Sequence, residues 1–81
     1  MATLPTPEET AREILAIFVS HFKSRPEDVL RINNFLAVWL PRGLAAEDFN
    51  PGMEYAVAQG WVEVRPGGES FKLTSAGFAA A

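Results

Sequence analysis

From Ala11 to Phe22, the chain has apolar residues spaced like one face of a helix. They fall at i, i+3, i+4, i+7, i+8 and i+11, a pattern typical of an amphipathic helix that buries one side: Ala11, Ile14, Leu15, Phe18, Val19 and Phe22. Thr6-Pro7-Glu8-Glu9 precedes them and has the form of a capping box with proline at the first helical position. We predict a first helix that starts there and ends near Lys23, with Glu8, Arg12 and Glu13 on its polar face.

Residues 29–40 are apolar on almost every side, which predicts a second helix that is the most enclosed element of the fold. Pro26 and the two acids after it suit a first helical turn, whose free N–H groups are partly positive. Residues 41–43, Pro-Arg-Gly, would end this helix, because proline cannot continue the hydrogen-bond ladder. Its polar strip would consist of Arg31, Asn33 and Asn34. Two residues, Ile17 and Val38, are expected outside the core.

A third helix is predicted before Gly60, which has the place of a C-terminal cap. The residues that would share its inner face are Phe49, Met53, Ala56, Val57 and Gly60 itself. Two starting points fit the sequence. The helix can begin near Glu47, which leaves Pro51 in the first turn, or it can begin with Asn50 as the N-cap and Pro51 at its first position.

Two β-prone runs, residues 61–65 and 70–74, predict a β-hairpin, because Pro-Gly-Gly between them is typical of a turn. Side chains alternate along a strand, so four residues should point to a common face: Val62, Val64, Phe71 and Leu73. Trp61 is expected to be buried or half-buried where the first strand starts.

Thr74 is able to cap a short last helix over residues 75–81, with Phe78 as its anchor in the core. The elements together predict a single α+β domain over residues 1–81, with its ordered core at about 6–80. We expect a three-helix bundle, a two-stranded β-hairpin and the short C-terminal helix. A domain of this size buries only roughly 60% of the surface that its unfolded chain exposes.

The formal charge of the chain is −3, from ten acids against seven bases, which is the wrong sign for bulk attraction to nucleic acid. Cysteine is absent, so no disulfide or thiolate metal cage holds the fold, and this suits a reducing compartment. The first ten residues lack the pattern of a signal peptide. The apolar runs are shorter than the ~20 residues of a membrane helix. We expect a soluble, cytoplasmic chain without membrane contact.

Candidate catalytic groups are sparse. His21 is the single histidine, and a general base needs an orienting partner and a nucleophile within reach, for which Ser20 and Ser24 are only neighbours along the chain. The dispersed carboxylates match no zinc or calcium pattern. Gly67-Gly68 lacks the lysine and following helix of a phosphate-binding loop. We therefore expect no enzymatic activity, no metal and no cofactor.

The order of these elements resembles the winged helix-turn-helix domains, particularly small bacterial regulators of the MarR-like and PadR-like type. The resemblance depends on Phe49, Met53 and Ala56 in the helix, on Gly60-Trp61-Val62 at the start of the hairpin, and on Leu73-Thr74-Ser75-Ala76-Gly77 after it. It covers about residues 8–80. It implies a recognition helix that enters the major groove of DNA and a hairpin wing on the backbone or minor groove.

The outward face of the recognition-like helix departs from that pattern, because none of its residues is able to neutralise a phosphate: Glu47, Pro51, Glu54, Tyr55 and Ala58. An exposed tyrosine beside a charge is common in protein interfaces. We therefore expect these residues to contact a protein partner, within a non-enzymatic regulatory binding module.

The alternative is a DNA-binding regulator that forms a homodimer, in which paired half-sites double a small set of basic contacts. Its phosphate contacts would be Arg31, Arg42, Arg65 and Lys72. Four such contacts give a salt slope of only about −3.6, which implies weak binding by one domain. A single basic face that includes the helix N-terminus would favour DNA, whereas basic residues scattered among acids would favour a protein partner.

Overall fold

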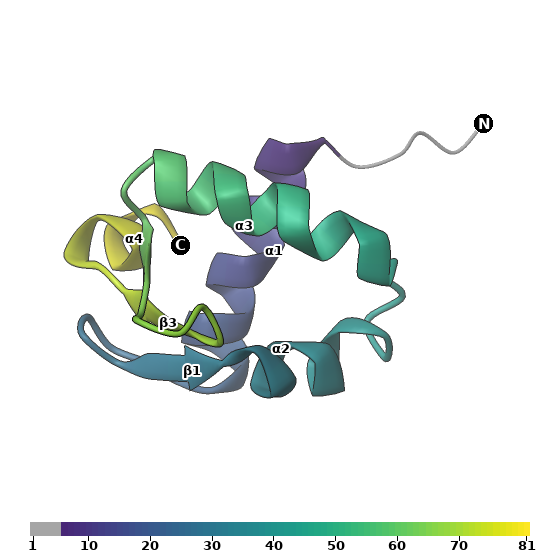
Figure 1. Ribbon diagram of the computed structural model, residues 1–81, viewed down its shortest axis with the longest axis horizontal. Helices are drawn as coiled ribbons and strands as arrows, with labels where there is room; N and C mark the ends of the chain where they lie inside the picture. Colours follow the sequence, from purple (N-terminus) through teal and green to yellow (C-terminus); the bar gives the residue numbers. More distant parts are fainter. Residues whose placement is uncertain (1–5) are drawn as a thin grey trace.

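Residues 6–81, which the computed structural model describes, form four α-helices and one small antiparallel sheet (Figure 1). The predicted α+β class is confirmed, and residues 1–5 of the predicted domain lie outside the described part. The elements in chain order are α1 (Pro7–Ala16), a π-helical segment (Ile17–His21), β1 (Val29–Arg31), α2 (Ile32–Trp39), a 3-10 turn (Ala46–Asp48), α3 (Phe49–Ala58), β2 (Val62–Val64), β3 (Ser70–Leu73) and α4 (Ser75–Ala80).

Helix α1 starts at the predicted capping box. The Thr6 hydroxyl accepts a hydrogen bond from the Glu9 N–H at 3.2 Å, and the Glu9 carboxylate accepts one from the Thr6 N–H at 3.0 Å. The helical path ends at His21, close to the predicted end. Ile17 is fully buried, so the prediction that it lies outside the core is wrong. Figure 1 shows α1 running from α3 towards the layer of β1 and α2, and Ile17, which directly follows α1, belongs to the buried core cluster.

The segment after Pro26 is the main departure from the sequence prediction. A second helix does not start there; instead Val29–Arg31 forms β1, and α2 begins only at Ile32. Strand β1 pairs with β3, with Leu30 opposite Phe71, and the sheet order is β1-β3-β2. A short apolar run has no periodicity that separates a strand from a buried helix, so the partner decides. Here the partner is the otherwise free edge of β3.

Helix α2 is not the enclosed element that the sequence predicts. Phe35 and Trp39 are fully buried, but Leu36 is 39% exposed and Leu40 is 62% exposed. Val38 is half-buried and packs against the core, which contradicts its expected place outside. Only one face of α2 has a covering element among residues 6–81, so a helix that is apolar all round is buried on one side alone.

The chain before α3 is helical from Ala46, which agrees with the predicted start near Glu47 and excludes Asn50 as the N-cap. Gly60 has φ +75°, as its predicted role of C-terminal cap requires. Phe49, Met53 and Ala56 are buried as predicted. Val57 is 37% exposed, so the prediction that it shares the buried face is wrong.

The β-hairpin is confirmed, with Val62 opposite Leu73 and Val64 opposite Phe71. The turn residues Gly67 and Gly68 both have positive φ. Three of the four residues on the predicted common face are buried, but Val64, the last residue of the edge strand β2, is 48% exposed.

Helix α4 is capped as predicted, because the Thr74 hydroxyl accepts a hydrogen bond from the Gly77 N–H at 3.0 Å. Phe78 is 41% exposed, so its predicted role as an anchor is wrong. The side of α4 that faces the core contains Gly77, which lies directly against the carbonyl of Trp61. A bulky side chain does not fit at that contact, so the phenylalanine is on the outer side.

Aromatic rings from four elements meet in the core. Phe35 lies at the centre, with ring centroids 5.0 Å from Phe18, 5.7 Å from Phe49 and 5.9 Å from Phe71. Trp39 joins the cluster beside Phe49 at 5.2 Å. This cluster holds the buried face of α3 beside the hairpin and so fixes the surface between them. No helix within residues 6–81 has the length and apolar character that crossing a membrane requires.

Candidate interaction surface

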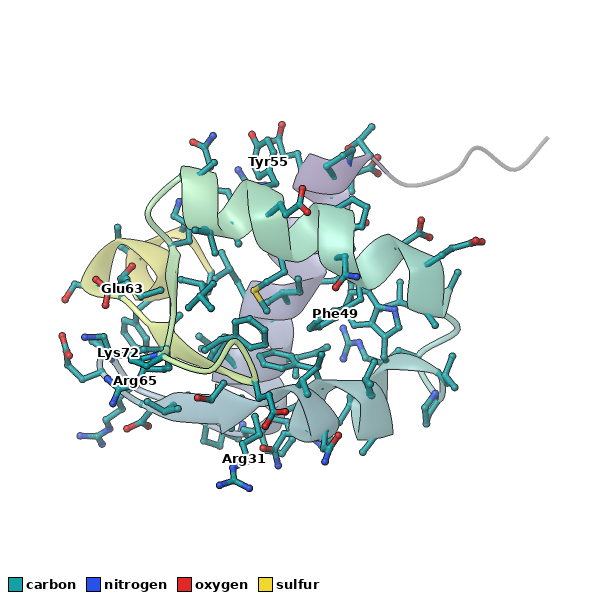
Figure 2. All side chains as sticks on the ribbon, in the orientation of Figure 1. Arg31, Phe49, Tyr55, Glu63, Arg65 and Lys72 are labelled. Carbon is teal, nitrogen blue, oxygen red and sulfur yellow. The ribbon has the colours of Figure 1, made fainter. Side chains whose placement is uncertain are left out.

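The predicted contact residues on α3 and on the turn before it are not all fully exposed. Glu47, Pro51, Glu54 and Ala58 are exposed. Tyr55 is half-buried, with its ring centroid 5.8 Å from that of Trp61. Figure 2 shows Tyr55 on the side of α3 away from the hairpin. Packing against Trp61 therefore occupies part of the tyrosine surface that the sequence offers for a partner.

An open groove of about 420 Å³ lies between α3 and the β-hairpin. Its α3 side consists of Asn50, Met53, Glu54, Val57 and Ala58. The opposite side consists of Val64, Gly68 and Phe71, with Ile32 at the start of α2. Two predicted contact residues, Glu54 and Ala58, thus belong to the groove.

The groove is mainly apolar because the two valines that the fold leaves partly uncovered face it from opposite sides. Val57 is 37% exposed and Val64 is 48% exposed. The sequence interpretation assigned both to the core and so missed them as surface residues. The sequence pattern correctly places Val57 in a helix and Val64 in a strand, but it does not give the distance between these two elements.

The two faces of the sheet differ in charge. Phe71 and Val64 point to the groove side. Side chains alternate along a strand, so Lys72 and Glu63 point to the opposite face, together with the residues that lie across from Ser70 on its two neighbouring strands, Arg31 and Arg65. Arg31 pairs with Ser70 in the register, and the Arg65 N–H donates to the Ser70 carbonyl at 2.9 Å. Figure 2 shows Arg31 pointing away from α3. Three of the four predicted basic residues therefore share the face that is turned away from the groove.

Two of the four predicted basic residues form ion pairs with acidic neighbours. The Lys72 Nζ lies 3.1 Å from a carboxylate oxygen of Glu63 and 3.1 Å from one of Glu27. Hydrogen bonds to these carboxylates raise the pKa of Lys72 above its usual value, and the bond to Glu63 is the largest cause. Arg42 forms an ion pair with Glu13 of α1 at 2.7 Å. Within residues 6–81, Arg31 and Arg65 form no ion pair at all. The N-terminus of α3 carries Glu47 and Asp48 instead of a cation.

A second hollow, of about 530 Å³, lies between the end of the π-helical segment and α2. His21 and Phe22 form one side, and Asn33, Val38 and Arg42 belong to the other. The His21 ring is exposed and stands edge-on to Phe22, with 4.6 Å between the centroids. No cluster of three or more histidine and carboxylate side chains suitable for a metal occurs among the described residues.

No family model, curated protein or solved structure matches this chain. The geometry itself defines a small α+β domain in which α3 and a β-hairpin flank an apolar groove. The groove has an acidic member, Glu54, and the opposite face of the same sheet carries the basic side chains.

Proposed function

We propose that this chain is a winged-helix domain that acts as a non-enzymatic regulatory binding module in the cytoplasm and contacts a protein partner through the outer face of α3. The order of α1, α2 and α3, followed by the β2–β3 hairpin, supports the winged-helix assignment. In that arrangement α3 has the position of a recognition helix and the hairpin that of a wing.

The observation that carries the proposal is the chemistry of the exposed α3 surface. It presents Glu47, Pro51, Glu54 and Ala58, and the groove beside it is lined by apolar side chains. A surface with carboxylates and without Lys or Arg repels the phosphates of DNA. Exposed apolar surface next to a few polar groups is typical of protein contact sites.

Site-specific photocrosslinking tests this function. A benzophenone amino acid is placed at Glu47, at Pro51 or at Ala58 of the full chain in its native cells, and at the exposed Ser20 as the control. We expect discrete protein adducts from the α3 positions and none from Ser20. Equal adducts from all positions, or none from α3, would contradict a partner on this surface.

DNA binding is the second candidate function, favoured by the shared sheet face of Arg31, Arg65 and Lys72. Two of these residues have no acidic partner among residues 6–81. Three phosphate contacts give a salt slope of about −2.7, so one domain binds weakly and a dimer is required for useful affinity. Arg42 does not belong to this face, because it lies in the connection after α2, where it pairs with Glu13 of α1.

A titration of labelled random duplex at low salt separates the two functions. We expect no binding up to tens of micromolar protein, because the α3 surface is acidic. Micromolar binding that weakens steeply with salt, and that Arg31→Ala and Arg65→Ala both reduce, would reverse the order of the two proposals.

A further inference from the structure

We infer that the groove between α3 and the β-hairpin binds an amphipathic helix of another protein, one that carries aliphatic side chains three or four residues apart and a Lys or Arg beside them. This inference rests on the proposed protein-binding function and specifies the chemistry of the partner. It assigns the contact to one flank of α3, where Val57 and Val64 face each other across the groove.

The dimensions of the groove match about two turns of a helix. The α3 residues that line it extend from Asn50 to Ala58, a rise of about 12 Å at the spacing of an α-helix. Two turns of a partner present apolar side chains at i, i+4 and i+7, the arrangement by which amphipathic helices dock in grooves.

The charge around the groove favours a basic partner. Glu54 is the one ionisable residue in its lining, and it is exposed. A second acid, the exposed Glu69, lies outside the lining but beside it, because its backbone carbonyl accepts a hydrogen bond at 2.9 Å from the N–H of Ile32, which lines the groove. Strand alternation sends Arg31 and Arg65 to the opposite face, so no cation of the lining neutralises these carboxylates.

A second copy of this chain fits the groove poorly. A symmetric pairing brings the same patch of both copies together, so both Glu54 carboxylates would lie in one largely apolar interface whose lining offers no cation. The net charge of −3 adds to that repulsion. The charge complement is therefore a basic segment of a different protein.

Selection from a random 16-residue peptide library, displayed on phage and presented to the immobilised full chain, tests the chemistry of the partner. We expect enriched peptides to contain aliphatic residues three or four apart and at least one Lys or Arg. In NMR titrations of the isotope-labelled chain, synthetic copies should shift the amide signals of Ile32, Val57 and Gly68. Helical signals should appear in the bound peptide.

Two pairs of matched variants localise the contact. Val64→Ser should weaken peptide binding about tenfold, because apolar contact is lost on binding, whereas Val29→Ser should change it less than about twofold. Val29 is a fair control, since it is 44% exposed in the same sheet but on the opposite face. Glu54→Gln should weaken binding about two- to fivefold at low salt, whereas Glu8→Gln, at the exposed start of α1 and outside the groove, should have little effect. Circular dichroism checks that each variant is folded.

The outcomes separate the inference from the proposed function. Enriched peptides that are acidic, or that shift only signals near Arg31 and Lys72, would overturn the inference. So would equal effects of Val64→Ser and Val29→Ser, or the absence of any peptide that binds with Kd below about 1 mM. In each of these cases protein adducts crosslinked from α3 would still support the proposed function, and their absence would reject it as well.

Discussion

At the scale of single residues, two glycines allow neighbouring elements to approach closely. A Cβ added to Gly52 would lie 2.5 Å from Cγ2 and 2.8 Å from Cβ of Thr10, where α3 crosses α1. A Cβ added to Gly77 would collide with the carbonyl of Trp61. Both glycines lie within helices and neither has a positive φ. Glycine is therefore needed at these positions for the close approach of a neighbouring element, and not for backbone freedom.

We predict that Gly52→Ala destabilises the domain by about 1–3 kcal/mol, because an overpacked contact pushes α3 away from α1. Thr10→Ser removes the nearest methyl group and should recover part of the loss in the double variant. Urea unfolding of the wild type, both single variants and the double variant measures this coupling. Additive effects would show that Thr10 is not the obstacle.

Two neighbouring residues of α2 should differ sharply in their contribution to the free energy of unfolding. Phe35→Ala removes the centre of the aromatic cluster and should lower the free energy of unfolding by about 3–5 kcal/mol. Leu36→Ala, on the 39% exposed side of the same helix, should lower it by less than about 1 kcal/mol. Thermal and urea unfolding provide the measurement, and similar losses in the two variants would contradict one-sided burial of α2.

At the scale of elements, charged hydrogen bonds fasten the start of α1 and the middle of the sheet. In the capping box, hydrogen bonds from the Thr6 backbone and then from its hydroxyl group lower the pKa of Glu9. In the sheet, Lys72 of β3 joins Glu63 of β2 to Glu27, which precedes β1. These two features predict opposite dependences on pH.

Glu9 has a lowered pKa in the folded state, so its contribution to stability is present above its ordinary value of 4.5 and is lost as the pH falls through the folded value. We expect the difference in the free energy of unfolding between the wild type and Glu9→Gln to shrink from pH 7 to pH 3. Urea unfolding at both values measures it. A difference that stays constant would mean that the carboxylate charge does not contribute. Glu8→Gln, without the bond to Thr6, is the control.

Lys72 has a raised pKa, so its contribution is present below its ordinary value of 10.5 and is lost as the pH rises through the folded value. The hydrogen bond to Glu63 is the larger cause. NMR titration of the Lys72 side chain should therefore show a lower pKa in Glu63→Gln and in Glu27→Gln than in the wild type. An unchanged pKa in either variant would show that the replaced carboxylate does not stabilise the ammonium group.

At the scale of the whole molecule, one core joins every layer. Buried residues of α1, α2, α3 and the sheet belong to a single cluster, to which Ala80 of α4 adds a partly buried contact. The radius of gyration, 11.6 Å, is that of a compact chain. No described element has a core of its own, so none is expected to unfold independently.

We predict a single cooperative transition. Fluorescence of Trp39 and Trp61, which lie in the core and at the start of the hairpin, should follow the same urea curve as circular dichroism at 222 nm. The Trp61→Phe variant isolates the signal of Trp39 as a control. Curves with separate midpoints would show that the hairpin and the helices are distinct folding units.

Much of the local structure follows from the sequence alone. The capping box at Thr6, the cap at Gly60, the hairpin around Gly67 and the Thr74 cap all occur where they were predicted. Each depends on atoms a few residues apart, so the chemistry of the local chain is sufficient to specify them. The α+β class follows from the order of these elements.

The tertiary structure alone decided which apolar residues are covered. Leu36, Val57, Val64 and Phe78 are each partly exposed, although periodicity predicts or permits their burial. Strand β1 likewise exists because β3 offers a free edge, a partner about 40 residues away in the sequence. A pattern states that a side chain is apolar, but coverage depends on what packs opposite, and the groove between α3 and the hairpin is the result.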